Sequence, residues 1–331
     1  MSSLTKRNHY NPCFWTAYWN PRYYQDAIDG RTVRGSHRRQ EIATLNLPAN
    51  RIVKTTVENV HFEKALGIAE MTPEAMRSFY RRRFPAKYNE VSRQLEADNR
   101  VLEMDFENIL EGLEATPAYR TLRELITGRP LLTLEDKSFL SCFIVIQALR
   151  SHEMMTAMIS RFASLGMQKF EYFWVLKNAM ATDLFDAPVS MIAFSHWLLY
   201  TSDEHVLPLC DSPVMIGPRS LMIPLSPRLL LEVDLTVRTS PRQWTIKGNI
   251  PSNKMREFRR RSIANSYRQI LFHDENVLAQ WQSTREFKSR VALIRDSKCY
   301  RHEIHGAAER VQWVLDGFAG PHTHRAVGRN T

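Results

Sequence analysis

The chain has 331 residues, 44% of them hydrophobic and 10% aromatic, which is enough for a sizeable core and excludes disorder throughout. Its apolar runs are short and broken by charge, so no transmembrane helix is expected, and residues 1–20 lack the apolar region of a signal peptide. The net charge is +10 and the four cysteines form no CxxC pair, which favours a cytoplasmic protein with reduced thiols.

The positive charge is clustered in three places, at Arg31–Arg39, at Arg81–Arg83 and between Lys254 and Arg268. Such clusters favour phosphate-bearing partners, because binding releases the counterions that phosphates hold. The alternative is a basic surface that is merely solvated. Charge therefore indicates a nucleic-acid partner and says nothing about a reaction.

The N-terminal half begins with an aromatic segment at residues 4–24, which we expect to pack against the core. A polar loop at residues 25–40 follows, and then two β-branched segments, Glu41–Leu47 and Arg51–Val57, which predict a strand pair. Capping residues, prolines and apolar periodicity predict the helices of the next part, at 73–84, 88–114, 117–127, from Thr133, 153–165, 168–181 and one that ends at Tyr200.

The central sheet is expected between Val206 and Val233. A short apolar strand, Val206–Cys210, ends at Asp211, and two proline-bounded runs follow at Leu221–Leu225 and Leu229–Val233. Beyond the sheet we expect a short strand at 243–246, a long basic helix at 252–273, a helix from Glu275, and a brief helix at 311–318 before a disordered tail.

These elements predict an α+β fold, a mainly α-helical single domain with a small, mostly antiparallel β-sheet. Residues 1–283 form this domain, including the N-terminal aromatic segment, and 284–331 form a C-terminal extension with one short helix and the disordered tail.

Polar residues interrupt two apolar helix faces. Gln147 and Arg150 continue the stripe that Phe139 and Phe143 begin, and Asn265 lies between two phenylalanines at seven-residue spacing. Burying such groups costs free energy unless they find partners. Asp211, at the end of a strand, is the expected partner of Arg150, because arginine binds carboxylates with two hydrogen bonds.

The start of the chain, KRNHYNPCFWTAYW, resembles the H-Y-V-P-Q-F-Y-L signature of the uncharacterised family called domain of unknown function 4238, with His9, Tyr10, Pro12 and Phe14 at matching positions. Three further blocks resemble that family: LSCFIVIQALR, CDSPVM followed by IPLSP, and NSYRQILF. Asn11 and Cys13 depart from the usual valine and glutamine, and Thr16 from leucine. The resemblance implies that His9, Gln147, Arg150, Asp211 and Asn265 share a site, but it supplies no reaction.

We interpret this set as the site of a metal-independent RNA or DNA phosphodiesterase of toxin or defence type. His9 is the candidate general acid or base, and Arg150 is the candidate phosphate clamp. Asp211 is the group that would orient His9 or Arg150. The substrate-binding candidates are Gln147, Asn265, Arg259 and Arg260. A structural reading competes with this one, because buried ion-pair networks and core histidines are common without catalysis.

Other chemistry has weaker support. The histidine pairs His302/His305 and His322/His324 and the group of Asp203, Glu204, His205 and Asp211 are poor matches to metal sites, so no metal or cofactor is expected. Cys13 or Cys210 could act as a nucleophile only with a nearby base. The alternative functions are a non-enzymatic basic module that binds nucleic acid or a partner protein, and a nucleotide-processing enzyme.

Overall fold

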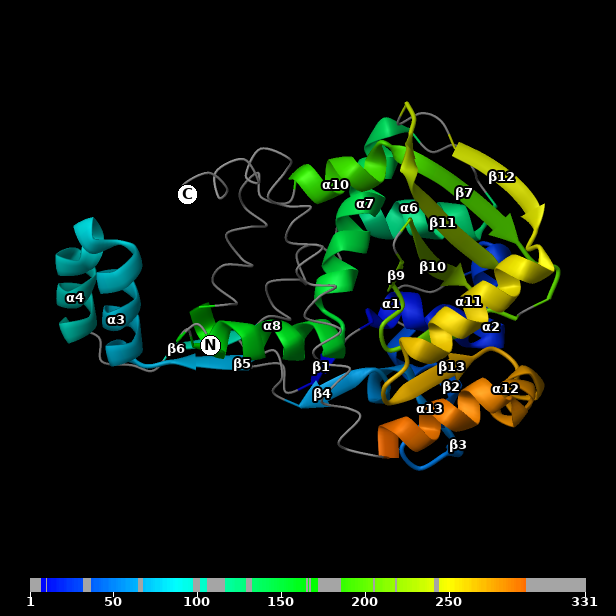
Figure 1. Ribbon diagram of the computed structural model, residues 1–331, viewed down its shortest axis with the longest axis horizontal. Coiled ribbons are helices and arrows are strands. Elements are labelled where there is room, and N and C mark those ends of the chain that lie inside the picture. The colour runs from blue at the N-terminus through cyan, green and yellow to red at the C-terminus, as the bar shows by residue number, and fades with distance from the viewer. Residues whose placement is uncertain are drawn as a thin grey trace, which may run out of the picture.

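The computed structural model describes residues 7–9, 11–31, 37–64, 68–97, 102–105, 117–128, 133–164, 166, 168–171, 186–204, 206–217, 219–240 and 244–295 (Figure 1). Two mostly antiparallel sheets and the helices around them form an α+β fold in this part of the chain, as predicted. The sheets are larger than the small sheet expected. Within the described residues, no helix has both the length and the apolar character needed to span a bilayer.

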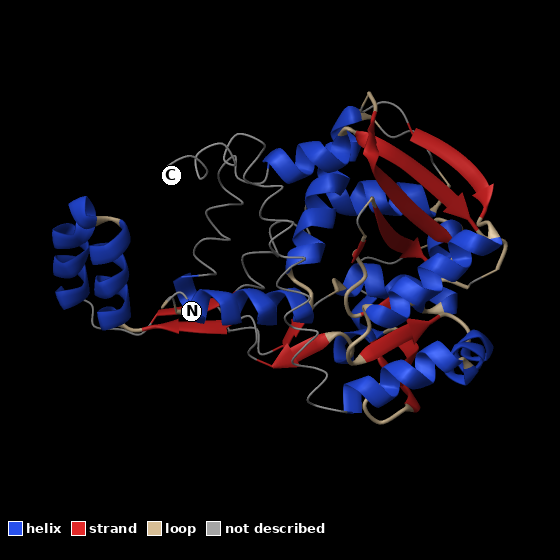
Figure 2. Ribbon diagram, in the orientation of Figure 1, coloured by secondary structure: helices blue, strands red, loops and turns tan. Residues whose placement is uncertain are grey.

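The larger sheet has five strands in the order β12-β7-β11-β10-β9 (Figure 2). They are β7 (Ser195–Thr201), β9 (Met215–Ile216), β10 (Ser220–Ser226), β11 (Leu229–Arg238) and β12 (Trp244–Asn249). β10 and β11 form an antiparallel hairpin that contains the two predicted apolar runs. β7 and β12 run parallel, so their carboxyl ends lie together at one edge.

The second sheet has four strands in the order β3-β2-β13-β8. They are β2 (Glu41–Asn46), β3 (Arg51–Thr56), β8 (Leu209–Cys210) and β13 (Gln269–Phe272). The predicted β2–β3 pair is confirmed. The predicted strand Val206–Cys210 is shorter than expected, and the chain passes from one sheet to the other between Cys210 and Met215.

A two-stranded ribbon of β5 (Ile68–Met71) and β6 (Leu102–Asp105) leads to the helix pair α3 (Pro73–Arg83) and α4 (Tyr88–Ala97), at the left of Figure 1. The helix predicted at 88–114 is therefore wrong from Leu102 to Asp105. Apolar and acidic residues alternate there with a period of two, which suits pairing with β5. A second ribbon pairs β1 (Arg7–His9) with β4 (Phe62–Lys64).

Helices cover both faces of the five-stranded sheet (Figure 2). On one face Trp197 and Leu231 share a core with the aromatic N-terminal segment, which is buried as predicted. The helical elements of the N-terminal half are α1 (Cys13–Thr16), η1 (Ala17–Trp19), α2 (Pro21–Ile28), η2 (His37–Arg39), η3 (Val57–Asn59), η4 (Pro85–Lys87), α6 (Pro117–Ile126), α7 (Leu134–Leu149), α8 (His152–Ser164) and α10 (Asp186–Ala193).

On the other face Tyr200 and Leu230 share a second core with α11 (Ser252–Ala264), α12 (Glu275–Ser283) and α13 (Arg285–Arg295). α13 lies beyond the expected boundary at 283 and buries Phe287 and Val291 in this core.

Two further predicted helices are wrong in part. In place of the helix expected to end at Tyr200, the chain forms α10 and then β7. The apolar residues from Trp197 to Tyr200 form a strand because they pair with β11. The helix predicted at 252–273 stops at Ala264, and β13 follows. The predicted helix at 311–318 and the tail lie outside the described residues, as does the greater part of 168–181.

Candidate functional site

A buried chain of hydrogen bonds joins three segments that are remote in sequence. The Gln147 amide of α7 donates to the Asn11 side-chain oxygen at 2.9 Å. The Asn11 amide nitrogen donates to the Cys210 carbonyl at 2.9 Å and lies 2.7 Å from Nδ1 of His61. Asn11 and Gln147 are each 1% exposed. Asn11 thus connects the aromatic segment, α7 and the end of β8.

His61 extends this network to the second sheet. Its backbone N–H donates to the Gln269 side chain at 2.8 Å, at the start of β13. His61 has a φ of +50°, in the left-handed region that only a few non-glycine residues adopt. Its imidazole, 2% exposed, is held inside the protein and not in an open cleft.

Asp211 holds the turn between α11 and β13. Its carboxylate accepts the backbone N–H groups of Tyr267 at 3.0 Å, Arg268 at 2.6 Å and Gln269 at 3.2 Å. The side chain is 1% exposed. Three convergent N–H donors are the partners a buried carboxylate needs, so this arrangement fixes the point at which β13 joins the sheet.

The remaining candidates of the expected site stand on three different elements. Arg150 is the C-cap of α7 and is 2% exposed, and its ion pair with Asp211 stays a prediction. Asn265 is the C-cap of α11, and its side chain donates to the Arg261 carbonyl at 2.8 Å. His9 pairs with Phe62 in β1–β4, which places its backbone next to His61 in the ribbon; its side chain lies outside the described set.

Asn11 and His61 are the site residues that sequence reasoning missed. Asn11 stands inside a run of aromatic residues, and that context is a signal of a buried amide with partners. His61 has no comparable signal, because its role depends on a backbone conformation. The Cys210 thiol beside them is buried, which raises its pKa well above the ordinary range and keeps it protonated, unlike a nucleophilic cysteine.

An open cavity lies at the carboxyl ends of β7 and β12. Its volume is about 470 Å³, within the range of small-molecule sites. Crevices at the carboxyl ends of parallel strands are common ligand sites in α/β sheets. Residues of the loop after β7, the end of β12 and the first turns of α11 line it: Ser202, Asp203, Glu204, Val206, Asn249, Ile250, Ser252, Met255, Arg256 and Arg259.

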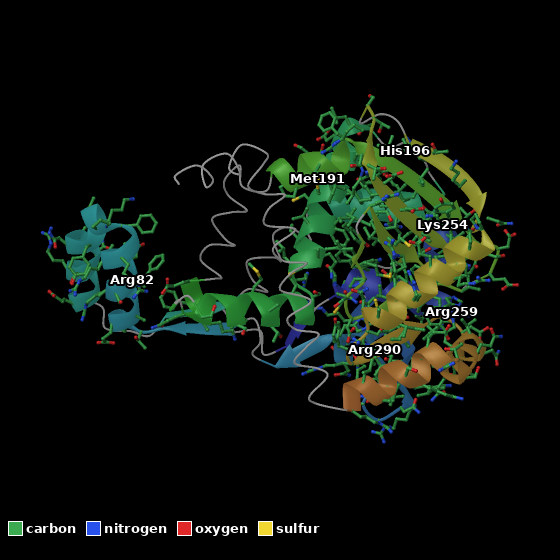
Figure 3. The ribbon with its side chains drawn as sticks, in the orientation of Figure 1. Arg82, Met191, His196, Lys254, Arg259 and Arg290 are labelled. Carbon is green, nitrogen blue, oxygen red and sulfur yellow. The ribbon has the colours of Figure 1, made fainter. Side chains whose placement is uncertain are left out.

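One wall of the cavity is basic. Arg256, Arg259 and Arg260 follow one another at helical spacing on the outward face of α11, and the first two line the cavity. None of these three has an ion pair or hydrogen bond within the described part of the chain. Figure 3 shows Arg259 and Lys254 along this helix. We call these three residues the arginine row.

The other cations of α11 have acidic partners. Lys254 pairs with Glu232 at 2.6 Å and with Glu257 at 3.4 Å, and Arg261 pairs with Glu257 at 2.5 Å. Neutralised cations of this kind offer little to an anionic ligand. The arginine row therefore carries the positive charge of α11 that is available to a partner, and it includes the predicted substrate-binding residues Arg259 and Arg260.

The opposite wall is acidic. Asp203 and Glu204 stand on the loop after β7, where Asp203 accepts the Asn249 amide at 3.2 Å. The loop starts from a fixed point, because the Ser202 N–H donates to the Arg228 carbonyl at 2.8 Å and Arg228 Nε donates back at 2.7 Å. Among the described residues, no group of three or more His, Cys, Asp or Glu side chains is placed to hold a metal ion.

No family model, no curated protein and no solved structure matches the chain. The resemblance to the uncharacterised family therefore stays a prediction.

Proposed function

We propose that this protein binds nucleic acid through the arginine row of α11. The observation that carries the proposal is that exposed Arg256 and Arg260 and half-buried Arg259 share one helix face without acidic partners among the described residues. Guanidinium groups bind phosphate with paired hydrogen bonds, and phosphate contacts supply the larger part of affinity for nucleic acid. The +10 net charge draws the same partner toward the protein.

The proposal assigns the buried polar set a structural role. Gln147, Arg150 and Asp211 are 1–2% exposed, so a phosphodiester has no access to them in this conformation. Their hydrogen bonds pin α7, β8 and the α11–β13 turn together. This favours a binding protein over the metal-independent phosphodiesterase expected from the sequence. We propose a cytoplasmic location as well, because the Cys142 and Cys210 thiols are free and reduced thiols are typical of that compartment.

The test compares two triple variants of equal charge. The first replaces Arg256, Arg259 and Arg260 with glutamine. The second variant is the control, and it replaces Arg22, Arg39 and Arg51 with glutamine. These three arginines are exposed and lie outside α11. Fluorescence anisotropy with labelled single-stranded RNA and DNA measures Kd. We expect the affinity of the arginine-row variant to fall at least tenfold and that of the control to fall only slightly. Equal losses of affinity would contradict the proposal.

Cleavage is measured in the same samples. Products formed by the wild-type chain and lost in His9→Ala, with binding retained, would restore the phosphodiesterase reading. Binding without products, with or without magnesium, supports the binding protein proposed here.

A further inference from the structure

We propose that the cavity beside α11 takes one ribonucleotide unit of a bound RNA strand, with Asp203 reading the ribose 2′-hydroxyl. The inference rests on the proposed function and adds the substrate class. It is carried by the opposite charges of the two cavity walls, Arg256 and Arg259 on one and Asp203 and Glu204 on the other.

The acidic wall disfavours a phosphate on its own side of the cavity, because Asp203 and Glu204 would repel it. The basic wall requires an anionic group at one end. A nucleotide satisfies both walls, since its phosphate suits Arg256 and Arg259 while its sugar presents hydroxyl donors. A carboxylate that accepts the 2′-hydroxyl is an established way to recognise ribose, and deoxyribose lacks that donor.

The geometry of Asp203 suits this role. Asn249 donates to one of its oxygens at 3.2 Å, and the carboxylate has capacity for further donors. Asn249 follows Gly248, which has a φ of +69° and lies where the register between β12 and β7 shifts. Asn249 pairs with Thr201, the last residue of β7, which places it beside the loop that begins at Ser202.

The arginine row also favours a strand over a free small molecule. Arg260 lies one residue beyond Arg259 and does not line the cavity, so positive charge continues outside it. A free amino acid could pair its carboxylate with an arginine and its ammonium with Asp203, but it would leave Arg260 without a contact. A strand with successive phosphates uses all three arginines.

The experiment measures affinity for three oligonucleotides of one sequence: RNA, DNA and 2′-O-methyl RNA, whose sugar cannot donate. We expect the wild type to bind RNA about tenfold tighter than the other two oligonucleotides, because only RNA can donate a hydrogen bond to the charged Asp203 carboxylate. Asp203→Ala should abolish this preference while DNA affinity stays equal or rises, because a negative charge is removed. Glu286→Ala, an exposed acidic residue on α13, is the control and should keep the preference.

Equal wild-type affinity for the three oligonucleotides overturns the ribose assignment and leaves the proposed function standing. A preference that survives in Asp203→Ala also overturns it. Displacement of the RNA by a free amino acid at millimolar concentration, with no difference among oligonucleotides, assigns the cavity to that ligand. If no oligonucleotide binds, the proposed function itself has failed.

Discussion

Asn11 shows how much of the fold depends on one side chain. It accepts from Gln147, donates to the Cys210 carbonyl and contacts the His61 ring, so three segments lose a partner if it is removed. Its position could be read from the sequence only as an irregularity in an aromatic run. Its partners could not, because they lie 50 to 199 residues away along the chain.

Asn11→Ala should destabilise the fold by about 3 kcal/mol, because it leaves buried polar groups without one of their hydrogen bonds. Urea unfolding at neutral pH measures the change. Asn276→Ala, at an exposed position of α12, is the control and should shift stability by less than about 0.5 kcal/mol. Similar values for the two variants would mean that the network does not hold the segments together.

Lys137 is a buried cation on α7. Its Nζ donates to the Ser195 carbonyl at 3.3 Å and lies 4.9 Å from the centre of the Trp197 ring. Burial lowers its pKa to about 8. In the unfolded chain the pKa is about 10.4, so between these values the unfolded state binds more protons than the folded state. Protonation of Lys137 therefore opposes folding at neutral pH, and this penalty fades as the pH rises through the window.

The stability of the wild type relative to Lys137→Met should accordingly increase between pH 7 and pH 10, by at most about 3 kcal/mol. Chemical denaturation of both proteins at each pH gives the difference, in which the titrations of other groups cancel. A pH-independent difference for Lys137→Met would show that this side chain is not desolvated.

At the scale of elements, the ends of helices were predictable where a local residue sets them. Thr133 begins α7 through a capping box: it accepts the Asp136 N–H at 3.1 Å, and the Asp136 carboxylate accepts the Thr133 N–H at 2.9 Å. The sequence predicts this start because both partners lie within one turn.

The end of α11 was not predictable in this way. Phe258, Asn265 and Phe272 recur every seven residues, which is typical of one helix, yet the helix stops at Ala264. Asn265 donates to the Arg261 carbonyl, and Asp211 accepts the backbone N–H groups of Tyr267, Arg268 and Gln269. The helix ends because a carboxylate more than fifty residues away binds these donors, and no local pattern carries that information.

Thr133→Ala should cost about 1 kcal/mol, because the first turn of α7 loses its side-chain acceptor. Thr133→Ser keeps the hydroxyl and should remain close to the wild type. Thermal unfolding of the two variants side by side gives the comparison. Equal midpoints would exclude a contribution of the capping box to stability.

At the scale of the whole molecule, composition and apolar patterning were sufficient for the α+β class, for the apolar strands β10 and β11 and for the β2–β3 pair, because each depends on residues that are near neighbours in sequence. The pairing of β13 with β2 and β8, and the parallel β7–β12 pair that builds the cavity, join remote segments. The site residues also fall into those that a local sequence pattern reveals and those that only contacts between remote segments reveal. The arginines of α11 were found from charge alone, whereas the acidic wall opposite them required the fold.

Net charge acts at this same scale, because it attracts any polyanion, and the arginine row must be distinguished from that general attraction. Each phosphate contact to a single strand contributes about −0.7 to the slope of log K against log salt. Loss of contacts in the arginine row should therefore make the slope less negative, whereas loss of charge elsewhere should leave it almost unchanged.

The most direct measurement of the central claim is the salt dependence of single-stranded RNA binding by the wild type, the arginine-row variant and the control variant. We expect that replacing Arg256, Arg259 and Arg260 makes the slope less negative by about 2, and that replacing Arg22, Arg39 and Arg51 does not. Identical slopes for the two triple variants would contradict it, because the arginine row would then make no phosphate contacts of its own.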